Sequence, residues 1–312
     1  MTDTTRDLRT DTGLDVACHI NALLPTADLE LLPIALSALA DAGFSRIVLP
    51  PLDPKTTDAA ALAAVLRDHG MTGLTIAGGQ GGQADVSSED AGRRAAGAAL
   101  LRDVVDLTVA LGGDQMNGVP YGPFGPPQGP TSAAVVERAA AEVGAVADYA
   151  HERGVTMTFE VLNRYETSLL NTAEQAMAFA ELSGSPHLRI HLDTFHMAVE
   201  EADMSAAIRT ALPRLGYLEL GQSGRGRLST GVVALAYVVR QALDDGYEGR
   251  WGVEAFSRSV LAGPVADMLA IWRAPYDDGA ELARDAMRVI RQGWSLSTVG
   301  RRNQRLARSA AS

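Results

Sequence analysis

Carboxylates close four consecutive segments that have the length and apolar content of buried strands. Glu160 falls near the end of VTMTFEVLN, and LRIHLDTFH ends with Asp193 and His196. Further along, Glu219 lies in LGYLELGQS and Glu254 in RWGVEAFS. One such acid could be a solvated strand end, but four packed together repel one another unless a cation or protons neutralise them. The pattern therefore indicates a metal site or a proton-transfer site.

The first two of these acids belong to one strand-helix-strand unit, residues 155–196. A helical run from Thr172 to Leu182 separates the two predicted strands. Parallel strands need such a crossover, and the crossover is almost always right-handed. Glu160 and Asp193 are therefore expected at the same, C-terminal, edge of the sheet.

The same alternation of strand and helix extends through the chain. Eight strands are predicted, at 14–22, 45–52, 71–79, 114–123, 155–163, 188–196, 215–223 and 250–257. The last helix is expected at about 264–291, with an irregular interruption at PYDDG. Eight such units predict an α/β protein with a single (β/α)8 barrel, whose sites lie at the C-terminal strand ends. We expect a flexible segment at 1–13, the barrel at 14–295 and a basic, disordered tail at 296–312.

Composition narrows the classes of partner and compartment. With 312 residues and 46% hydrophobic composition, the chain can bury one large core. A formal net charge of -11 disfavours binding to nucleic acid, which needs clustered Lys and Arg. The single cysteine, Cys18, excludes an intrachain disulfide and fits a cytoplasmic protein. The polar start and the lack of 18 uninterrupted apolar residues disfavour secretion and membrane spanning.

At the acidic segments the chain resembles the ketose 3-epimerases (D-tagatose 3-epimerase and D-psicose or D-allulose 3-epimerase) of the xylose-isomerase-like barrel superfamily. The resemblance runs from about residue 14 to 292. The matching stretches are FEVLNRYE (159–166), LDTFHM (192–197), LGQSGRGRL (220–228), VEAF (253–256) and, more loosely, IWR (271–273). The combination of LDTFHM with an upstream EVxNRxE is far more specific than a pair of acids.

This resemblance implies a C3 epimerase of a free ketose that acts through an enediolate by two-base proton transfer. The groups matching Glu160 and Glu254 would exchange the substrate proton. One divalent metal ion, Mn²⁺ or Mg²⁺ with Co²⁺ possible, would be held by Glu160, Asp193, Glu219 and Glu254. Glu166, His196 and Arg225 would hold substrate oxygens. A small-molecule sugar is the expected partner, and a homodimer or homotetramer the expected assembly.

The chain departs from the family pattern in the seventh strand. Where the family has a histidine ligand in a run like FHVGEANR, this chain has LELGQSGR. Glu219 therefore stands in place of the imidazole, and Gln222 in place of a glutamate. A carboxylate can still bind a metal, and an all-oxygen shell suits magnesium or manganese.

Other activities begin with the same chemistry and stay open. A lyase or dehydratase acting on a 3-keto sugar, a 3-keto glycoside or an inosose also starts with metal-assisted proton abstraction. An apurinic-site endonuclease needs a histidine-rich site and a basic DNA face, whereas this chain has six histidines and a negative charge. A partner subunit without activity would not need both proposed bases.

Overall fold

The computed structural model describes residues 12–78 and 80–311. Most of the expected flexible segment, 1–13, lies outside the described residues. Within them, no helix is long and apolar enough to cross a membrane.

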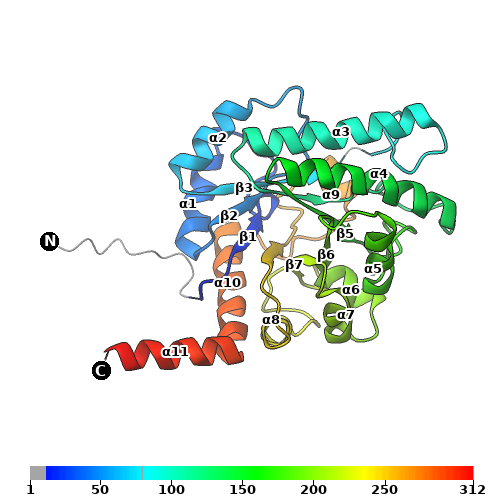
Figure 1. Cartoon of the computed structure of the whole chain (residues 1–312). Coiled ribbons are helices and arrows are strands. Elements are labelled where there is room, and N and C mark those ends of the chain that lie inside the picture. Colours follow the sequence, from blue (N-terminus) through cyan, green and yellow to red (C-terminus); the bar gives the residue numbers. More distant parts are fainter. Residues whose placement is uncertain (1–11, 79, 312) are drawn as a thin grey trace.

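The strands close into a parallel barrel in sequence order, as predicted, and β1 pairs with β8 to complete the ring (Figure 1). They are β1 Val16–His19, β2 Arg46–Val48, β3 Thr72–Ala77, β4 Gln115–Gly118, β5 Thr156–Val161, β6 Arg189–Asp193, β7 Leu215–Gly221 and β8 Arg250–Glu254. Each strand is shorter than the sequence pattern suggested, because the chain turns away from the barrel once its ladder partners end.

The helices surround this barrel and cover its outer face (Figure 1). They are η1 Ile20–Ala22, α1 Leu32–Ala42, α2 Ala59–Asp68, α3 Ala91–Ala110, α4 Ala133–Glu152, α5 Ala173–Leu182, α6 Thr194–Glu200, α7 Met204–Ala211, α8 Leu235–Asp244, α9 Gly263–Met268, α10 Gly279–Leu296 and α11 Thr298–Ala311. Aspartate side chains cap several of them; Asp58 accepts a hydrogen bond from the Ala61 N–H and Asp90 from the Arg93 N–H. The main core lies between barrel and helices, and a small cluster of Ala17, Val48, Leu74 and Tyr217 fills the barrel interior.

The register of β5 to β8 explains how four acids from four strands share one height. Asp193 pairs with Glu219, whereas Glu160 pairs with His191 and Glu219 with Gly252. Relative to the paired residue on the preceding strand, the acid therefore lies two residues further along on β6, level on β7 and two residues further along on β8. Eight-stranded barrels advance by about one residue per strand because the strands tilt. The offset thus follows the tilt and keeps the acids at the same end of the barrel.

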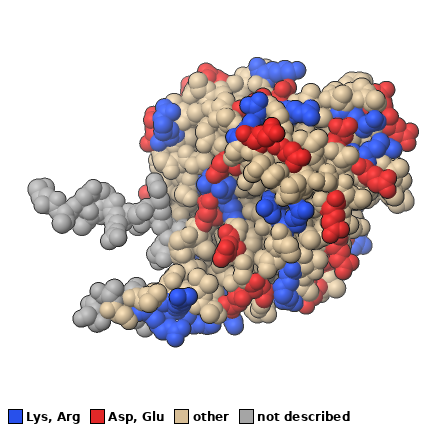
Figure 2. Space-filling model, viewed as in Figure 1, with Lys and Arg blue, Asp and Glu red and all other residues tan. Residues whose placement is uncertain are grey.

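Two local expectations differ from the structure. His196 lies in the first turn of α6 and not on β6, because the Asp193 carboxylate accepts the Phe195 N–H and starts that helix directly at the strand end. The interruption expected at PYDDG is present, and it divides the last helical segment into α9 and α10. The tail at 296–312 was expected to be disordered, but residues 298–311 form α11. This helix projects from the barrel beside α10 and carries exposed arginines, visible as a basic cluster at its end of the molecule (Figures 1 and 2).

An ion-pair network closes the N-terminal end of the barrel. The Arg46 Nε lies 2.7 Å from Asp15 Oδ1, and its Nη1 lies 2.8 Å from Asp114 Oδ1. Arg250 makes matching contacts, 2.9 Å to Asp15 Oδ2 and 3.1 Å to Asp114 Oδ2. Burial alone would raise the pKa of the Asp114 carboxyl, but the two arginines outweigh it and lower that pKa. The network ties β1, β2 and β8 to the start of β4 without leaving net charge.

Asp114→Asn is expected to lower the free energy of unfolding at pH 7 by about 1–2 kcal/mol, since the group is half-exposed. The lowered pKa stabilises the fold above the unfolded value, 3.8, and this contribution is lost as pH falls through the lower folded value. The variant should therefore lose less stability than the wild type between pH 5 and 3. Urea unfolding at both pH values tests this, with the exposed Asp41→Asn as control; equal acid sensitivity of Asp114→Asn and wild type would contradict it.

Candidate active site

A cavity of about 770 Å³ opens at the C-terminal ends of the strands. Its polar lining comes from the β5 to β8 side and from β1: Glu160, Glu166, His196, Arg225, Glu254 and His19. Its other side is mainly apolar, with Pro50, Leu52, Val119 and Phe124 among the lining residues. Asp193 and Glu219 are fully buried and lie behind this lining, among the described residues.

One wall of the cavity is organised by His196. Its Nε2 lies 3.4 Å from Glu160 Oε1 and 3.9 Å from Glu166 Oε2. Its Nδ1 accepts a hydrogen bond from the Asn163 backbone N–H at 3.1 Å. A backbone N–H can only donate, so Nδ1 carries a lone pair and the neutral ring must carry its proton on Nε2. His196 therefore presents an N–H donor to the cavity, beside Glu160.

Arg225 organises the adjoining part of this polar lining, because its side chain and that of His196 both contact Asp193 Oδ2. Its Nη1 lies 3.4 Å from Asp193 Oδ2 and contacts Glu254 Oε2. The guanidinium carbon lies 3.6 Å from the centre of the Phe195 ring, so the cation is held flat over an aromatic face. Phe195 thus supports the arginine side chain. The Arg225 backbone has φ +55°, a conformation that a non-glycine residue adopts at some energetic cost.

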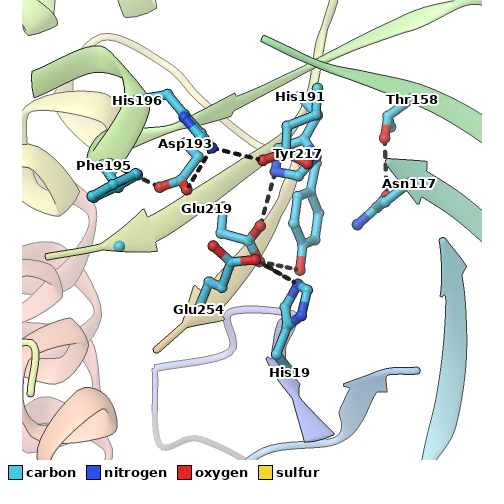
Figure 3. Close-up of polar contacts among 12 residues, drawn as sticks. His19, Asn117, Thr158, His191, Asp193, Phe195, His196, Tyr217, Glu219 and Glu254 are labelled. Carbon is cyan, nitrogen blue, oxygen red and sulfur yellow. Dashed lines mark hydrogen bonds and ion pairs between the residues drawn. The ribbon is translucent and has the colours of Figure 1, made fainter. Parts of the chain in front are cut away.

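Beside this lining lies a buried set that we call the Glu219 cluster, made of Glu219, His19, His191 and Tyr217 (Figure 3). His19 lines the cavity, and the other three side chains lie behind it. Glu219 Oε1 lies 3.3 Å from His19 Nε2 and 3.4 Å from the Tyr217 hydroxyl, which donates to it. Glu219 Oε2 lies 3.1 Å from His191 Nε2. Within the described residues, Oε2 and both His191 ring nitrogens have no partner in hydrogen-bond geometry. Buried polar atoms of this kind mark a place where an ion or another group is expected.

The buried carboxylates have different proton affinities. Burial alone would raise the pKa of Glu160, but His191 and the hydrogen bond from His196 outweigh it and lower that pKa. Burial acts in the same direction on Glu219, where His19 and His191 more than compensate and the pKa falls. For Asp193 burial dominates over His196 and Arg225, so its pKa is raised. Glu160 is therefore held ionised at neutral pH, as a base must be, whereas Asp193 lacks a sufficient positive partner.

The donor set fits a divalent cation. Three overlapping groups place their ligand atoms within 4.8 Å of one another: His19, Glu219 and Glu254; Glu160, His191 and Glu219; and Glu160, Asp193 and His196. Carboxylates dominate each group, a chemistry that suits magnesium or manganese. A cation placed here would also supply the positive charge that Asp193 lacks.

All predicted site residues meet at this end of the barrel, although the roles assigned to them stay predictions. The sequence analysis missed two neighbours of these residues, His191 and His19. His191 is buried and lies between Glu160 and Glu219. The sequence contains signals for both residues. His191 shares a strand face with Asp193, and closure of the barrel places the end of β1, with His19, beside the end of β8.

Gly252 makes room for the Glu219 cluster on β8. A Cβ added there would lie 2.4 Å from the Tyr217 hydroxyl and 2.5 Å from Glu219 Oε1. We expect Gly252→Ala to lower the free energy of unfolding by about 1–3 kcal/mol, because neither buried side chain can move aside freely. Gly263→Ala, where the added atom meets nothing within 4 Å, is the control. Equal urea midpoints for the two variants would show that the cluster tolerates the extra methyl.

A closed barrel with acids, imidazoles and an arginine around a cavity at its C-terminal end has the architecture of a barrel enzyme. The family model for the xylose isomerase-like TIM barrel matches residues 36–293. A ketose 3-epimerase of Arthrobacter globiformis is 36% identical over 278 residues, 89% of this chain and 96% of that protein. An L-ribulose 3-epimerase of Mesorhizobium japonicum is 37% identical, covering 84% and 87%.

A solved structure, a D-allulose 3-epimerase of Methylomonas sp. in complex with D-allulose, superposes with a TM-score of 0.84 at 32% identity. The match covers 89% of this chain and 96% of that one. The chain belongs to the xylose isomerase-like TIM barrel family and, within it, to the ketose 3-epimerases.

Proposed function

We propose that this enzyme inverts C3 of a free ketose by removing the C3 proton and returning one on the opposite face. The observation that carries the proposal is that Glu160 and Glu254 line one cavity from strands three places apart in the ring, with buried acids between them. The relatives support the same reaction, since their names record C3 epimerisation of ketoses, and one was solved with D-allulose bound.

Each residue of the cavity lining has a proposed role that follows from its position. Glu160, held ionised, takes the proton from one face of C3, and Glu254 supplies a proton to the other face. The His196 Nε2–H and the Arg225 guanidinium donate hydrogen bonds to substrate oxygens, and Glu166 accepts one from a hydroxyl. Because the two proposed bases come from strands three places apart in the ring, each can reach a different face of C3, and inversion needs no rotation of the substrate.

A divalent cation, manganese or magnesium, completes the proposal. Glu160, Asp193 and Glu254 would hold it, with the remaining ligand from the Glu219 cluster. When bound, it supplies Lewis-acid stabilisation of the negative charge that develops when the C3 proton leaves. The protein residues set which face of the sugar loses its proton and which regains it.

The alternative function is that of a lyase or dehydratase acting on a 3-keto sugar, a 3-keto glycoside or an inosose. The size of the cavity supports this alternative. A cavity of about 770 Å³ with one apolar side is in the range that holds ligands larger than a free ketose. Such a substrate would use the same proton abstraction and then eliminate a leaving group.

The test is to incubate the Mn²⁺-loaded protein with a ketopentose, two ketohexoses, a 3-keto glycoside and an inosose, and to follow each by NMR. We expect the C3 epimer of at least one free ketose as the only product. Consumption of the glycoside or the inosose, with every free ketose unchanged, would replace epimerisation by elimination.

We also propose a cytoplasmic homodimer or homotetramer. Exposed apolar side chains on α10 and α11, namely Leu296, Val299 and Leu306, give a surface that self-association would bury. Light scattering on the purified protein is expected to give a mass of two or four chains, and a monomer at micromolar concentration would contradict the proposal.

A further inference from the structure

We propose that His19 is the imidazole ligand of the divalent cation, and that it completes the shell formed by the carboxylates. The inference rests on the cation proposed above and adds a residue from β1 that the sequence did not assign. Three imidazoles lie among the buried acids, those of His19, His191 and His196, and the structure distinguishes between them.

The position of His19 is that of a ligand. Its Nε2 lies 3.3 Å from Glu219 Oε1 and 3.7 Å from Glu254 Oε1. Neighbouring ligands of one octahedral cation with bonds of about 2.1 Å are separated by about 3 Å, so these spacings need only a small contraction. His19 also lines the cavity, as do Glu160 and Glu254, so a cation bound to it would face a substrate.

His196 is excluded by its tautomer. Its Nδ1 accepts the Asn163 N–H, and the proton that this leaves on Nε2 occupies the nitrogen that faces Glu160 and Asp193. A metal ligand needs a lone pair at that atom. His196 is therefore a hydrogen-bond donor at the site and not a ligand.

His191 is excluded by its depth. It stands two residues before Asp193 on β6, is 1% exposed, and lies outside the cavity lining formed by the described residues. Its ring packs edge-on against Tyr217, with centroids 4.7 Å apart. A cation bound there would lie beneath the carboxylate layer, out of reach of a sugar.

The test uses pulsed EPR of the full-length protein loaded with Mn²⁺. A coordinated imidazole nitrogen modulates the manganese spin echo, and we expect this ¹⁴N modulation in the wild type. It should vanish in His19→Gln and persist in His191→Gln and His196→Gln. We also expect Mn²⁺ to bind His19→Gln at least about 100-fold more weakly, a loss beyond the 10–100-fold typical of outer groups. Modulation that persists in His19→Gln, or is absent in the wild type, would overturn the assignment.

Circular dichroism and the melting temperature of each variant confirm that the fold is retained. Should His19→Gln not fold, ¹⁵N-histidine labelling of the wild type still tests for a coordinated imidazole, and His191→Gln and His196→Gln still decide whether it is one of the other two. Failure here is distinct from failure of the proposed function. An enzyme that epimerises ketoses but shows no nitrogen modulation refutes only the role of His19, whereas modulation without epimerisation refutes only the reaction.

Discussion

Glu160→Gln and Glu254→Gln are each expected to reduce kcat by about 10⁴-fold or more, because each removes a base that the reaction uses. Glutamine keeps the shape and the hydrogen-bonding capacity of the side chain but cannot accept the C3 proton. Steady-state assays on the preferred ketose measure the effect. The exposed Glu174→Gln on α5 is the matched control and should keep wild-type kcat.

The two variants should also differ from each other in a way that a merely structural role would not produce. With a base on each face, one variant should still exchange the C3 proton of one epimer with solvent deuterium without completing the inversion. The other variant should do the same with the opposite epimer. Equal loss of exchange in both variants and with both epimers would argue against the assignment of one base to each face.

Removal of the divalent cation is expected to lower turnover by about 10³-fold or more, because several kcal/mol of charge stabilisation are lost with it. Dialysis against a chelator followed by elemental analysis gives the metal-free protein. Mn²⁺ or Mg²⁺ should restore activity, and Zn²⁺ should restore less, since the donors are mainly oxygens. Full activity in protein shown to be free of metal would contradict the prediction.

The metal-free protein is nevertheless expected to stay folded. Each buried acid has a positive or imidazole partner in the structure: Arg225 contacts Asp193 and Glu254, His196 contacts Glu160, and two imidazoles contact Glu219. Added cation should raise the melting temperature by mass action, equivalent to about 2.7 kcal/mol at a free concentration 100 times the Kd. Calorimetry with and without Mn²⁺ tests this.

The fold and the acidic part of the site could be predicted because both rest on short-range pattern. Apolar runs ended by an acid, separated by helical runs, specify the strands and the edge at which Glu160 and Glu254 emerge. The contacts of His19 and His191 were harder to predict, because they form between side chains of different strands, and those of His19 join the first strand to the last two. His196 was placed on a strand because the pattern does not show that Asp193 starts a helix at once. The tail was assigned to disorder from its charge, although its residues also fit one face of a helix.

The most direct test of the account is turnover in D₂O. Wild-type enzyme loaded with Mn²⁺ is incubated with an accepted ketose until a small fraction has reacted, and both epimers are analysed by NMR and mass spectrometry. Removal of the C3 proton by one residue and its replacement from another predicts one deuterium at C3 of the product and none at other carbons. A C3 epimer that forms with its original proton retained would contradict two-base epimerisation.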